Sequence, residues 1–354
     1  MDLKELRRLQ SEADGVFSSG TPTPRAFGAV DREYRAVRTD VGLLDRTDLG
    51  RLLVRGPDRF TWLQGLVSND VRPLAAKADR VQACILDATG HIQADVTLVR
   101  LADAILVETE RPSLDHLAAL LDGYLIGEDA TIEDATDSIV CLSLQGPRAA
   151  DLRSAAPEFL ACVAADHTGD GGFDLYWPAD RVADAWSALR RAGATPVGED
   201  AAEILRVEAG IPRYGLDLNA TVLPLEAGLA ATHLSVAKGC YVGQEIVARI
   251  RAQGKTNRQL SGLRLDERSG APGDWVMHDG RVVGRLTSVV DAIGVPGQIA
   301  LGYLRHEVRA PGSRVTIAAA NGRVEATVAA LPFVSRKSGA QPPTGRTPKG
   351  KRAR

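Results

Sequence analysis

The sequence predicts an α+β protein made of two different regions. Up to about residue 255, short strand-like runs alternate with short helix-like runs. After residue 256 the runs are strand-like, are separated by Gly, Pro and Asp, and none is long enough to predict a helix. Because the chain has 354 residues and a single hydrophobic core rarely serves more than about 250, we expect two or three domains.

The first region, residues 1–255, is expected to contain two subdomains, which can be interleaved along the chain. Residues 51–56 and 104–109 are apolar runs typical of strands. Residues 181–193 have the pattern of an amphipathic helix that ends at a glycine.

A unit of strand, Gly-Pro and helix occurs at residues 52–66 and again at residues 141–155. Proline suits the first turn of a helix, because the N–H that it lacks would have no partner there. The recurrence indicates two related half-units in the first region.

The second region, residues 256–335, is expected to be a separate small β domain. The last segment, residues 336–354, holds seven basic residues and no acidic residue, and it lacks core-forming side chains. This composition predicts a disordered tail, which either solubilises the protein or makes weak contacts with RNA or an acidic partner.

The overall charge excludes two classes of main partner. Lys and Arg number 43, Asp and Glu number 45, and the formal net charge is −2. Neither a specific nucleic acid nor an anionic membrane is therefore expected. The N-terminal segment is charged throughout, and no apolar run approaches the roughly 18 residues that span a bilayer. We expect a soluble, cytoplasmic monomer.

The four cysteines are too far apart for a Cys-x-x-Cys metal or redox pair, and no metal site is expected. Cys84, Cys141 and Cys162 lie in apolar runs, which indicates small buried side chains. Cys240 lies instead between Gly239 and Gly243, in the stretch AKGCYVGQEIVARI.

The run that follows Cys240 predicts the start of either a helix or a strand. If a helix begins there, its N–H groups and Lys238 would favour the thiolate and lower the pKa of Cys240. The residues alone leave two interpretations open, a functional thiol and a buried structural cysteine. His233 lies seven residues before Cys240, and a packed or surface histidine is the simpler interpretation for it.

The pattern K-G-C-Y-x-G-Q-E-x-x-A-R at residues 238–249 resembles the signature of the YgfZ family. These are folate-binding proteins that support iron–sulfur cluster assembly, within the superfamily of the glycine-cleavage T-protein, an aminomethyltransferase. The resemblance extends over residues 25–335. It implies a cloverleaf of α/β subdomains around a central folate channel, with a C-terminal β-barrel.

The resemblance also implies a folate site. The stretch DATGHIQADVTLV is similar to the T-protein motif around its catalytic carboxylate, which makes Asp95 the candidate; an exposed strand residue is the alternative. The stretch HTGDGGFDLYWP places Asp170 where the T-protein uses a Glu to hold the pterin ring, although a Gly-rich turn would explain it equally. The further residues that the resemblance places at the folate are Arg206, Glu208, Tyr214, Glu226, Lys238, Tyr241 and Arg249.

Three functions agree with these patterns. The first is a protein that binds tetrahydrofolate, or a one-carbon derivative of it, and supports assembly or repair of iron–sulfur clusters through Cys240. Its partners would be iron–sulfur enzymes or cluster-assembly proteins. The second is a folate-dependent aminomethyltransferase or demethylase that acts through Asp95, which leaves the Cys240 motif unexplained. The third is a folate-sensing scaffold. We rank them in this order, and whether the protein is an enzyme is open.

Overall fold

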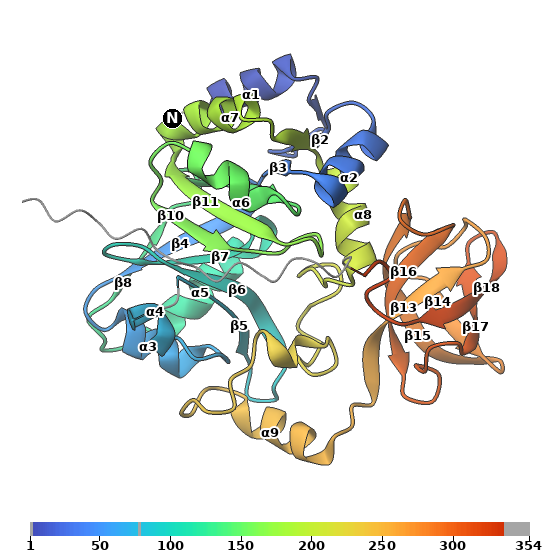
Figure 1. The fold of residues 1–354 in the computed structure, drawn as a ribbon. Helices are drawn as coiled ribbons and strands as arrows, with labels where there is room; N and C mark the ends of the chain where they lie inside the picture. The colour runs from blue at the N-terminus through green and yellow to red at the C-terminus, as the bar shows by residue number, and fades with distance from the viewer. Residues whose placement is uncertain (1–2, 77–78, 336–354) are drawn as a thin grey trace, which may run out of the picture.

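The computed structural model describes residues 3–76 and 79–335. Two stacked sheets with helices on their outer faces form one part, and a β-barrel forms the other (Figure 1). This arrangement confirms the predicted fold class. The predicted basic tail, residues 336–354, lies outside the described residues.

The first sheet carries helices on one face. Its strands are, in spatial order, β10 (Ala161–Ala164), β11 (Gly172–Pro178), β9 (Ile139–Gln145), β3 (Gly42–Asp45) and β12 (Thr195–Val197). Only β12 pairs in parallel, with β3. The covering helices are α1 (Leu3–Glu12), α6 (Ala149–Leu152) and α7 (Val182–Arg191), and Trp177 and Trp186 lie in the core beneath them. α7 confirms the helix predicted at 181–193.

The second sheet is antiparallel throughout. Its strands are β5 (Arg80–Leu86), β6 (Ile92–Arg100), β7 (Ile105–Glu110), β4 (Leu49–Arg55) and β8 (Thr131–Asp134). Helices α3 (Arg59–Leu66), α4 (Arg72–Ala76) and α5 (Leu114–Gly123) cover its outer face. β4 and β7 confirm the two strands predicted near 51–56 and 104–109.

The inner faces of the two sheets pack against each other. Leu53, Val99 and Leu106 of the second sheet share one buried cluster with Val163 and Tyr176 of the first. The molecule therefore has four layers here, in the order helix, sheet, sheet, helix (Figure 1). Toward one edge of this interface the inner faces become polar, and the cavities described below lie there.

The two Gly-Pro turns predicted from the sequence occupy matching places. Gly56 follows β4 and precedes α3, and Gly146 follows β9 and precedes α6. Their φ angles are +99° and +125°. A Cβ atom on Gly56 would lie 2.2 Å from the Asp129 carbonyl oxygen, and one on Gly146 would lie 2.5 Å from the Asp40 carbonyl oxygen. Both turns therefore require glycine.

The C-terminal part is a closed barrel. Its strands are, in spatial order, β13 (Arg258–Leu265), β16 (Gln298–Arg305), β15 (Arg281–Asp291), β14 (Trp275–His278), β17 (Arg314–Ala319) and β18 (Gly322–Ala329). Leu263, Val276 and Ile317 are among the apolar side chains of its core. The expected β domain is thus a six-stranded barrel, while the predicted residue limits of the domains stay a prediction.

Helix α8 (Glu199–Ala209) and the segment after it join the sheets to the barrel. Val207 and Leu218 pack with Ile299 and Tyr303 of the barrel in a shared core. The remaining α-helices and strands of the described ranges are β1 (Val16–Phe17), β2 (Pro24–Ala26), α2 (Val30–Thr39) and α9 (Gln244–Gln253).

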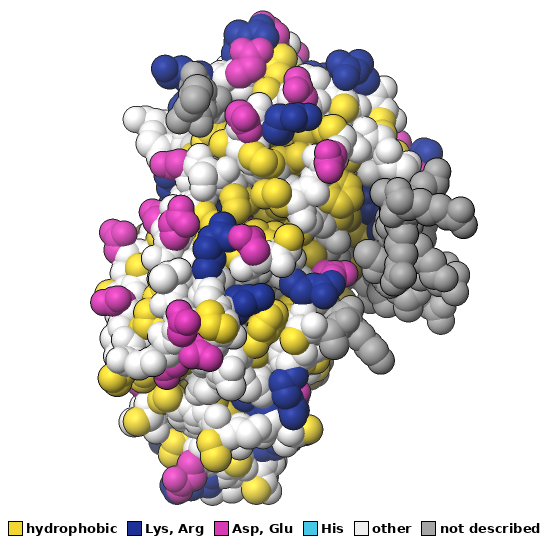
Figure 2. All heavy atoms as spheres, turned by 90° about the vertical axis from the view of Figure 1, so that its left-hand side faces the viewer, with side chains coloured by type: hydrophobic (Ala, Val, Ile, Leu, Met, Phe, Trp, Pro, Cys, Tyr) yellow, Lys and Arg dark blue, Asp and Glu magenta, His cyan; other side chains and the backbone are white. Residues whose placement is uncertain are grey.

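The surface of the face shown in Figure 2 has acidic and basic side chains interspersed, and its described residues form no large patch of one sign. None of the helices in the described ranges is both long and apolar enough to cross a bilayer.

Candidate functional site

Two adjoining cavities lie where the sheets, α8 and the barrel meet. Cavity 1, of about 190 Å³, lies between the polar edges of the two sheets and α8. Cavity 2, of about 1020 Å³, continues from it to the barrel. Volumes of this size suit a small organic molecule. The residues that line both cavities are Arg80, Gln82, Asp95, Asp166, Ile211 and Pro212.

Asp95 lies in the middle of β6, on the strand face that is turned toward the cavities. Its neighbours Ala94 and Val96 point to the opposite face, into the core beneath α3 and α5. The Asp95 side chain is 25% exposed, and its Oδ1 lies 3.1 Å from Nε2 of His233. The carboxylate is thus held on one side by the imidazole and open to the cavities on the other.

His233 is itself fixed by hydrogen bonds. Its Nδ1 lies 2.7 Å from the Thr232 hydroxyl oxygen, and its carbonyl oxygen accepts from the Ser68 hydroxyl at 2.7 Å. The N–H of Cys84, opposite Asp95 in the sheet, donates to the same Ser68 hydroxyl at 2.9 Å. We expected a packed or surface histidine at residue 233; the structure buries it and adds a pairing with Asp95.

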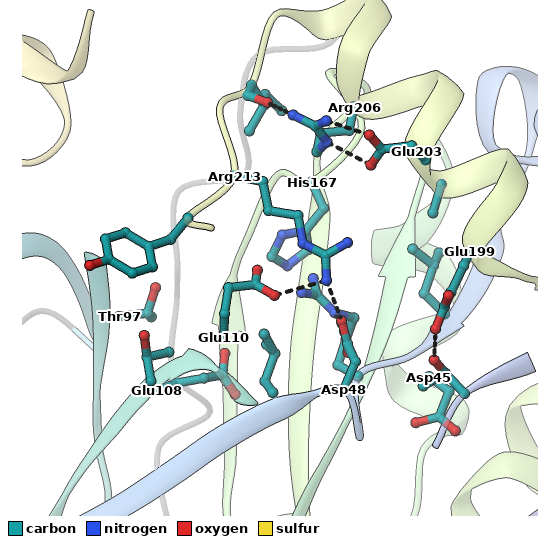
Figure 3. Close-up of a pocket in the computed structure, with 18 of the residues that line it drawn as sticks. Asp45, Asp48, Thr97, Glu108, Glu110, His167, Glu199, Glu203, Arg206 and Arg213 are labelled. Atoms are coloured by element: carbon teal, nitrogen blue, oxygen red, sulfur yellow. Dashed lines mark hydrogen bonds and ion pairs between the residues drawn. The ribbon is translucent and has the colours of Figure 1, made fainter. Parts of the chain in front are cut away.

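Carboxylates and arginines alternate along the wall of cavity 1 (Figure 3). Arg213 Nη2 lies 2.8 Å from Glu110 Oε2 and 3.5 Å from Asp48 Oδ2, and Arg46 Nε lies 3.2 Å from Asp48 Oδ1. Burial raises the pKa of Glu110, and the Arg213 charge offsets only part of this effect. These acceptor groups face a cavity in which N–H donors of a ligand would find partners.

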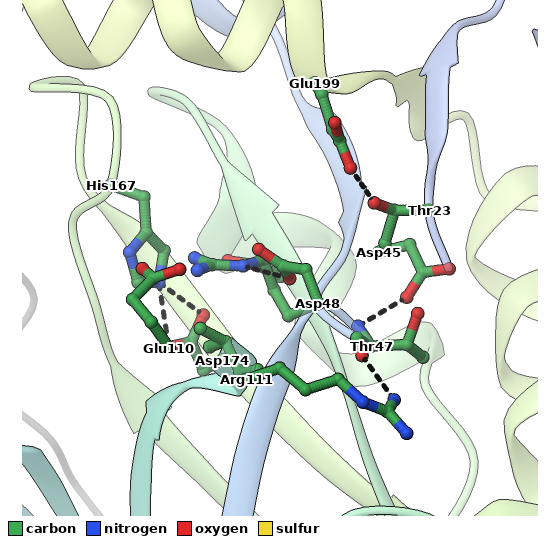
Figure 4. Close-up of polar contacts among 12 residues, drawn as sticks. Thr23, Asp45, Thr47, Asp48, Glu110, Arg111, His167, Asp174 and Glu199 are labelled. Carbon is green, nitrogen blue, oxygen red and sulfur yellow. Dashed lines mark hydrogen bonds and ion pairs between the residues drawn. The ribbon is translucent and has the colours of Figure 1, made fainter. Parts of the chain in front are cut away.

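Two further acids stand at the first sheet (Figure 4). His167 Nε2 lies 2.9 Å from Asp174 Oδ2. Burial alone would raise the pKa of Asp174, but His167 and the nearby guanidinium groups of Arg80 and Arg46 hold it well below the usual range. Asp45 accepts from the Thr47 N–H at 2.8 Å, and burial raises the pKa of Asp45 to about 6.

Asp170 and Glu208, both predicted to contact folate, lie together, and neither is among the residues that line the two cavities. Arg38 connects them, with Nη1 at 2.5 Å from Asp170 and Nη2 at 2.6 Å from Glu208. Glu208 also accepts from the Tyr34 hydroxyl at 2.6 Å and from the Gly294 N–H at 2.7 Å. Glu208 thus ties α8 to α2 and to the barrel, and Asp170 ties the loop before β11 to α2.

Three other predicted residues differ in their access to the cavities. Tyr214 lines cavity 1, and its hydroxyl donates to the Gln93 carbonyl at 2.6 Å. Arg206 lines cavity 1 too, but its guanidinium is already held by Glu203, Asp217, Ser288 and the Ile211 carbonyl (Figure 3). Glu226 accepts a hydrogen bond from Arg258 at 3.0 Å, and it is not among the described residues that line either cavity.

The loop that carries Cys240 is held by Lys238. The Lys238 ammonium donates to the backbone carbonyls of Gln64, Val67 and Asn69, and it lies 4.9 Å from the ring centre of Tyr241. Burial lowers the pKa of Lys238 to about 8. Lys238 therefore anchors this loop to α3 and the segment after it, while Tyr241 packs in a core with Cys84 and Leu86. Neither is among the cavity-lining residues.

Cys240 itself is exposed, while Cys84 and Cys141 are buried as predicted and Cys162 is half-buried. A helix, α9, begins after Gly243, whose φ is +80°, and this settles the choice between helix and strand. Arg249 lies on α9 and pairs with Glu245 at the surface. The Cys240 loop and the Asp95 cavities are thus separate features.

Several cavity residues escaped the sequence prediction. Arg46, Asp48 and Glu110 are brought together only by the pairing of β4 with β7 and by the approach of Arg213. Asp174, which pairs with the cavity-lining His167, left a signal, because an acid within the apolar run GFDLYW needs a partner when it is buried. Within the described ranges, no group of three His, Cys, Asp or Glu side chains could hold a metal ion.

Comparison with known protein families adds to this geometry. A model of the GCVT N-terminal domain matches residues 9–234, and a model of the glycine cleavage T-protein C-terminal barrel domain matches residues 258–335. This chain belongs to the glycine cleavage T-protein family. The wider superfamily predicted from the sequence is confirmed, and the narrower YgfZ membership stays a prediction.

Individual relatives of the T-protein family agree with this assignment. Proteins named aminomethyltransferase from Geobacillus kaustophilus and Exiguobacterium sibiricum are 29% and 30% identical to this chain. The matches cover 92% and 77% of this chain, and 95% and 81% of those proteins. The structure of glycine cleavage system aminomethyltransferase T from Bartonella henselae has the same fold, with a TM-score of 0.84 at 23% identity, over 94% of this chain and 98% of that one.

Proposed function

We propose that this protein binds tetrahydrofolate in the joined cavities and transfers a one-carbon unit to it from an amine, with Asp95 as the catalytic residue. The observation that carries the proposal is Asp95 itself, which is fixed by His233 and faces both cavities. The names of the relatives favour this function, our second hypothesis from the sequence, over iron–sulfur cluster repair.

The residues present suit a folate. A pterin ring offers adjacent N–H donors, which carboxylates accept in pairs. Cavity 1 supplies such acceptors in Glu110 and Asp48, and the apolar residues Leu49 and Ile211 also line it. Tetrahydrofolate, when bound, supplies the nitrogen that accepts the one-carbon unit. Cavity 2 has room for the rest of the molecule and for the amine donor.

Asp95 is suited to hold or move the proton that an amine nitrogen loses or gains during the transfer. A positioned general acid or base contributes about 10²–10⁴-fold to a rate. His233 holds the Asp95 carboxylate in one orientation through Oδ1, while the other carboxylate oxygen of Asp95 stays open to the ligand. The Thr109 hydroxyl donates to the Asp95 carbonyl at 2.9 Å and fixes the backbone at the same point.

The test is turnover of candidate methylated amines and aminomethyl donors with tetrahydrofolate, measured for the wild type and Asp95→Asn. We expect product from the wild type and a rate lower by about 10²-fold or more in the variant. Asp103→Asn is the matched control, because Asp103 is exposed and lines neither cavity, and it should keep full activity. Equal rates for Asp95→Asn and the wild type would reject Asp95 as the catalytic residue.

A second candidate function is supported by Cys240. We infer that its thiol serves the assembly or repair of iron–sulfur clusters in partner enzymes in the cytoplasm, as the YgfZ resemblance implies. Exposure of this cysteine, and the anchoring of its loop by Lys238, support a thiol that can react. Cys240 is not among the described residues that line the two cavities, so a reaction at this thiol would not compete with one-carbon transfer for the folate site.

The test of this second function is made in cells that lack the gene. Activity of an iron–sulfur enzyme such as aconitase is measured under oxidative stress, after complementation with the wild type, Cys240→Ser or Cys162→Ser. The thiol account expects Cys162→Ser to restore activity and Cys240→Ser to fail. Unchanged aconitase activity in the deleted strain would remove the iron–sulfur function.

A further inference from the structure

Arg80 differs from the other arginines of the two cavities. Arg46, Arg206 and Arg213 form ion pairs, and Arg309 donates to the Thr256 hydroxyl. Arg80 lines both cavities and lies near enough to Asp174 to lower the pKa of that carboxyl, yet its buried Nε has no hydrogen-bond partner among the described residues. A buried donor without a partner is unfavourable, so this N–H favours an acceptor supplied by a ligand.

The sheet places Arg80 on the same face as the reaction centre. Arg80 and Gln82 alternate with core residues on β5, and Cys84, two residues further on, is opposite Asp95 on β6. Arg80 and Cys84 are four residues apart, which is about 13 Å along a strand. A ligand that reaches Asp95 can therefore extend along β5 toward Arg80.

The charge around Arg80 makes its preference specific. The carboxylates that line cavity 1 outnumber its guanidinium groups, so an anionic ligand group is repelled from most of the wall. The lining carboxylates are Asp45, Asp48, Asp95, Glu108, Glu110, Asp166, Glu199 and Glu203. Arginine binds a carboxylate through two parallel N–H donors, a geometry that lysine cannot offer.

We propose that Arg80 is a binding residue for a carboxylate of the ligand. The inference rests on the proposed function and specifies its substrate. Two sources offer this group, namely the glutamyl end of the folate and the carboxylate of an amine donor that is an N-methyl amino acid. In either case Arg80 anchors one end of the ligand while Asp95 acts at the other.

Calorimetric binding to the full-length protein tests this inference with two pairs of probes. The first pair is 5-formyltetrahydrofolate and 5-formyltetrahydropteroate, which lacks the glutamate. The second pair is N-methylglycine and N-methylethylamine, which lacks the carboxylate. Each probe is measured on the wild type, on Arg80→Gln, and on Arg55→Gln, a control arginine at the end of β4 in the same sheet that pairs with the exposed Asp103.

In one of the two pairs, we expect Arg80→Gln to weaken binding of the probe with the carboxylate by roughly 10- to 100-fold. Binding of the probe that lacks the carboxylate should not change. The pair that responds identifies the source of the carboxylate. Arg80→Lys keeps the positive charge but lacks the two parallel N–H donors. We expect its affinity for the carboxylate-bearing probe to lie between those of the wild type and Arg80→Gln. If Arg80→Gln does not fold, as judged by circular dichroism, Arg80→Lys replaces it in the comparison.

Two results would overturn the inference. Equal affinity of the wild type and the Arg80 variants for all four probes would exclude a carboxylate contact, while leaving folate binding and the proposed function intact. An equal loss for both members of a pair would show that Arg80 only shapes the cavity. A wild type that binds neither folate probe would instead reject the proposed function together with this inference.

Discussion

At the scale of single residues, the site depends on charged groups that are partly buried and that the fold brings together from distant positions. Asp95 and His233 are separated by most of the first region, and their 3.1 Å contact exists only in the folded chain. Asp95 could be predicted because it lies in a recognisable local motif. His233 and Glu110 could not, since their roles follow from contacts across 138 and 103 positions, which no local pattern encodes.

Asp45 makes the stability of the protein depend on pH. Burial raises the pKa of Asp45 to about 6 from a usual value of 3.8. Between these pH values the folded state binds more protons than the unfolded state, so the free energy of unfolding falls as pH rises from about 4 to 6. The loss expected from this group is roughly 2–3 kcal/mol.

Urea unfolding of the wild type and Asp45→Asn at pH 4 and pH 6.5 measures this effect. In Asp45→Asn the free energy of unfolding should fall much less between these pH values, because asparagine does not titrate. Asp40→Asn, at an exposed pair with Arg148, is the control and should keep the wild-type pH dependence. The same decrease in Asp45→Asn as in the wild type would place the titrating group elsewhere.

At the scale of elements, the loop of residues 237–243 and helix α9 depend on one side chain. Lys238 donates to three backbone carbonyls at the end of α3 and just after it, and only Val247 of α9 is buried. The sequence indicated that Cys240 lies between two glycines and just before the start of a helix or a strand. That Lys238 points toward α3 rather than toward the thiol follows from tertiary packing.

Lys238→Met should free this loop. We expect faster amide hydrogen exchange over residues 236–247, by about tenfold for every 1.4 kcal/mol of local stability lost. Mass spectrometry of peptic fragments reads the change. Lys255→Met, at an exposed lysine after α9, should leave exchange unchanged. Identical exchange in the wild type and Lys238→Met would mean that Lys238 does not hold the loop.

At the scale of the whole molecule, the barrel completes the wall of cavity 2 by packing against α8 and the following segment. Asp217 is fully buried there; it accepts from Arg206 at 2.7 Å and from the Ser288 hydroxyl of the barrel at 2.8 Å. The two regions and the β character of the second were predictable, because strand periods and turn residues are local. Their docking was not, since it rests on contacts about 70 residues apart.

Asp217→Asn should destabilise this junction strongly. Removal of one partner of a buried ion pair costs up to about 3–5 kcal/mol; Arg206 keeps its pair with Glu203 but loses Asp217, its fully buried partner. Thermal unfolding and folate affinity should both fall, because the barrel forms part of the cavity wall. Asp266→Asn breaks an exposed pair with Arg314 and should change stability by less than about 1 kcal/mol. Equal melting temperatures for the two variants would contradict this account of the docking.

The central claim is that one-carbon transfer occurs at Asp95, and a single-turnover experiment tests it most directly. Wild type, Asp95→Asn and Cys240→Ser are mixed in excess with tetrahydrofolate and the donor found by screening, and the one-carbon folate product is followed with time. The account predicts the same rate for the wild type and Cys240→Ser, and a rate about 10²–10⁴-fold lower for Asp95→Asn with folate still bound. Wild-type rates in Asp95→Asn, or a loss confined to Cys240→Ser, would contradict it.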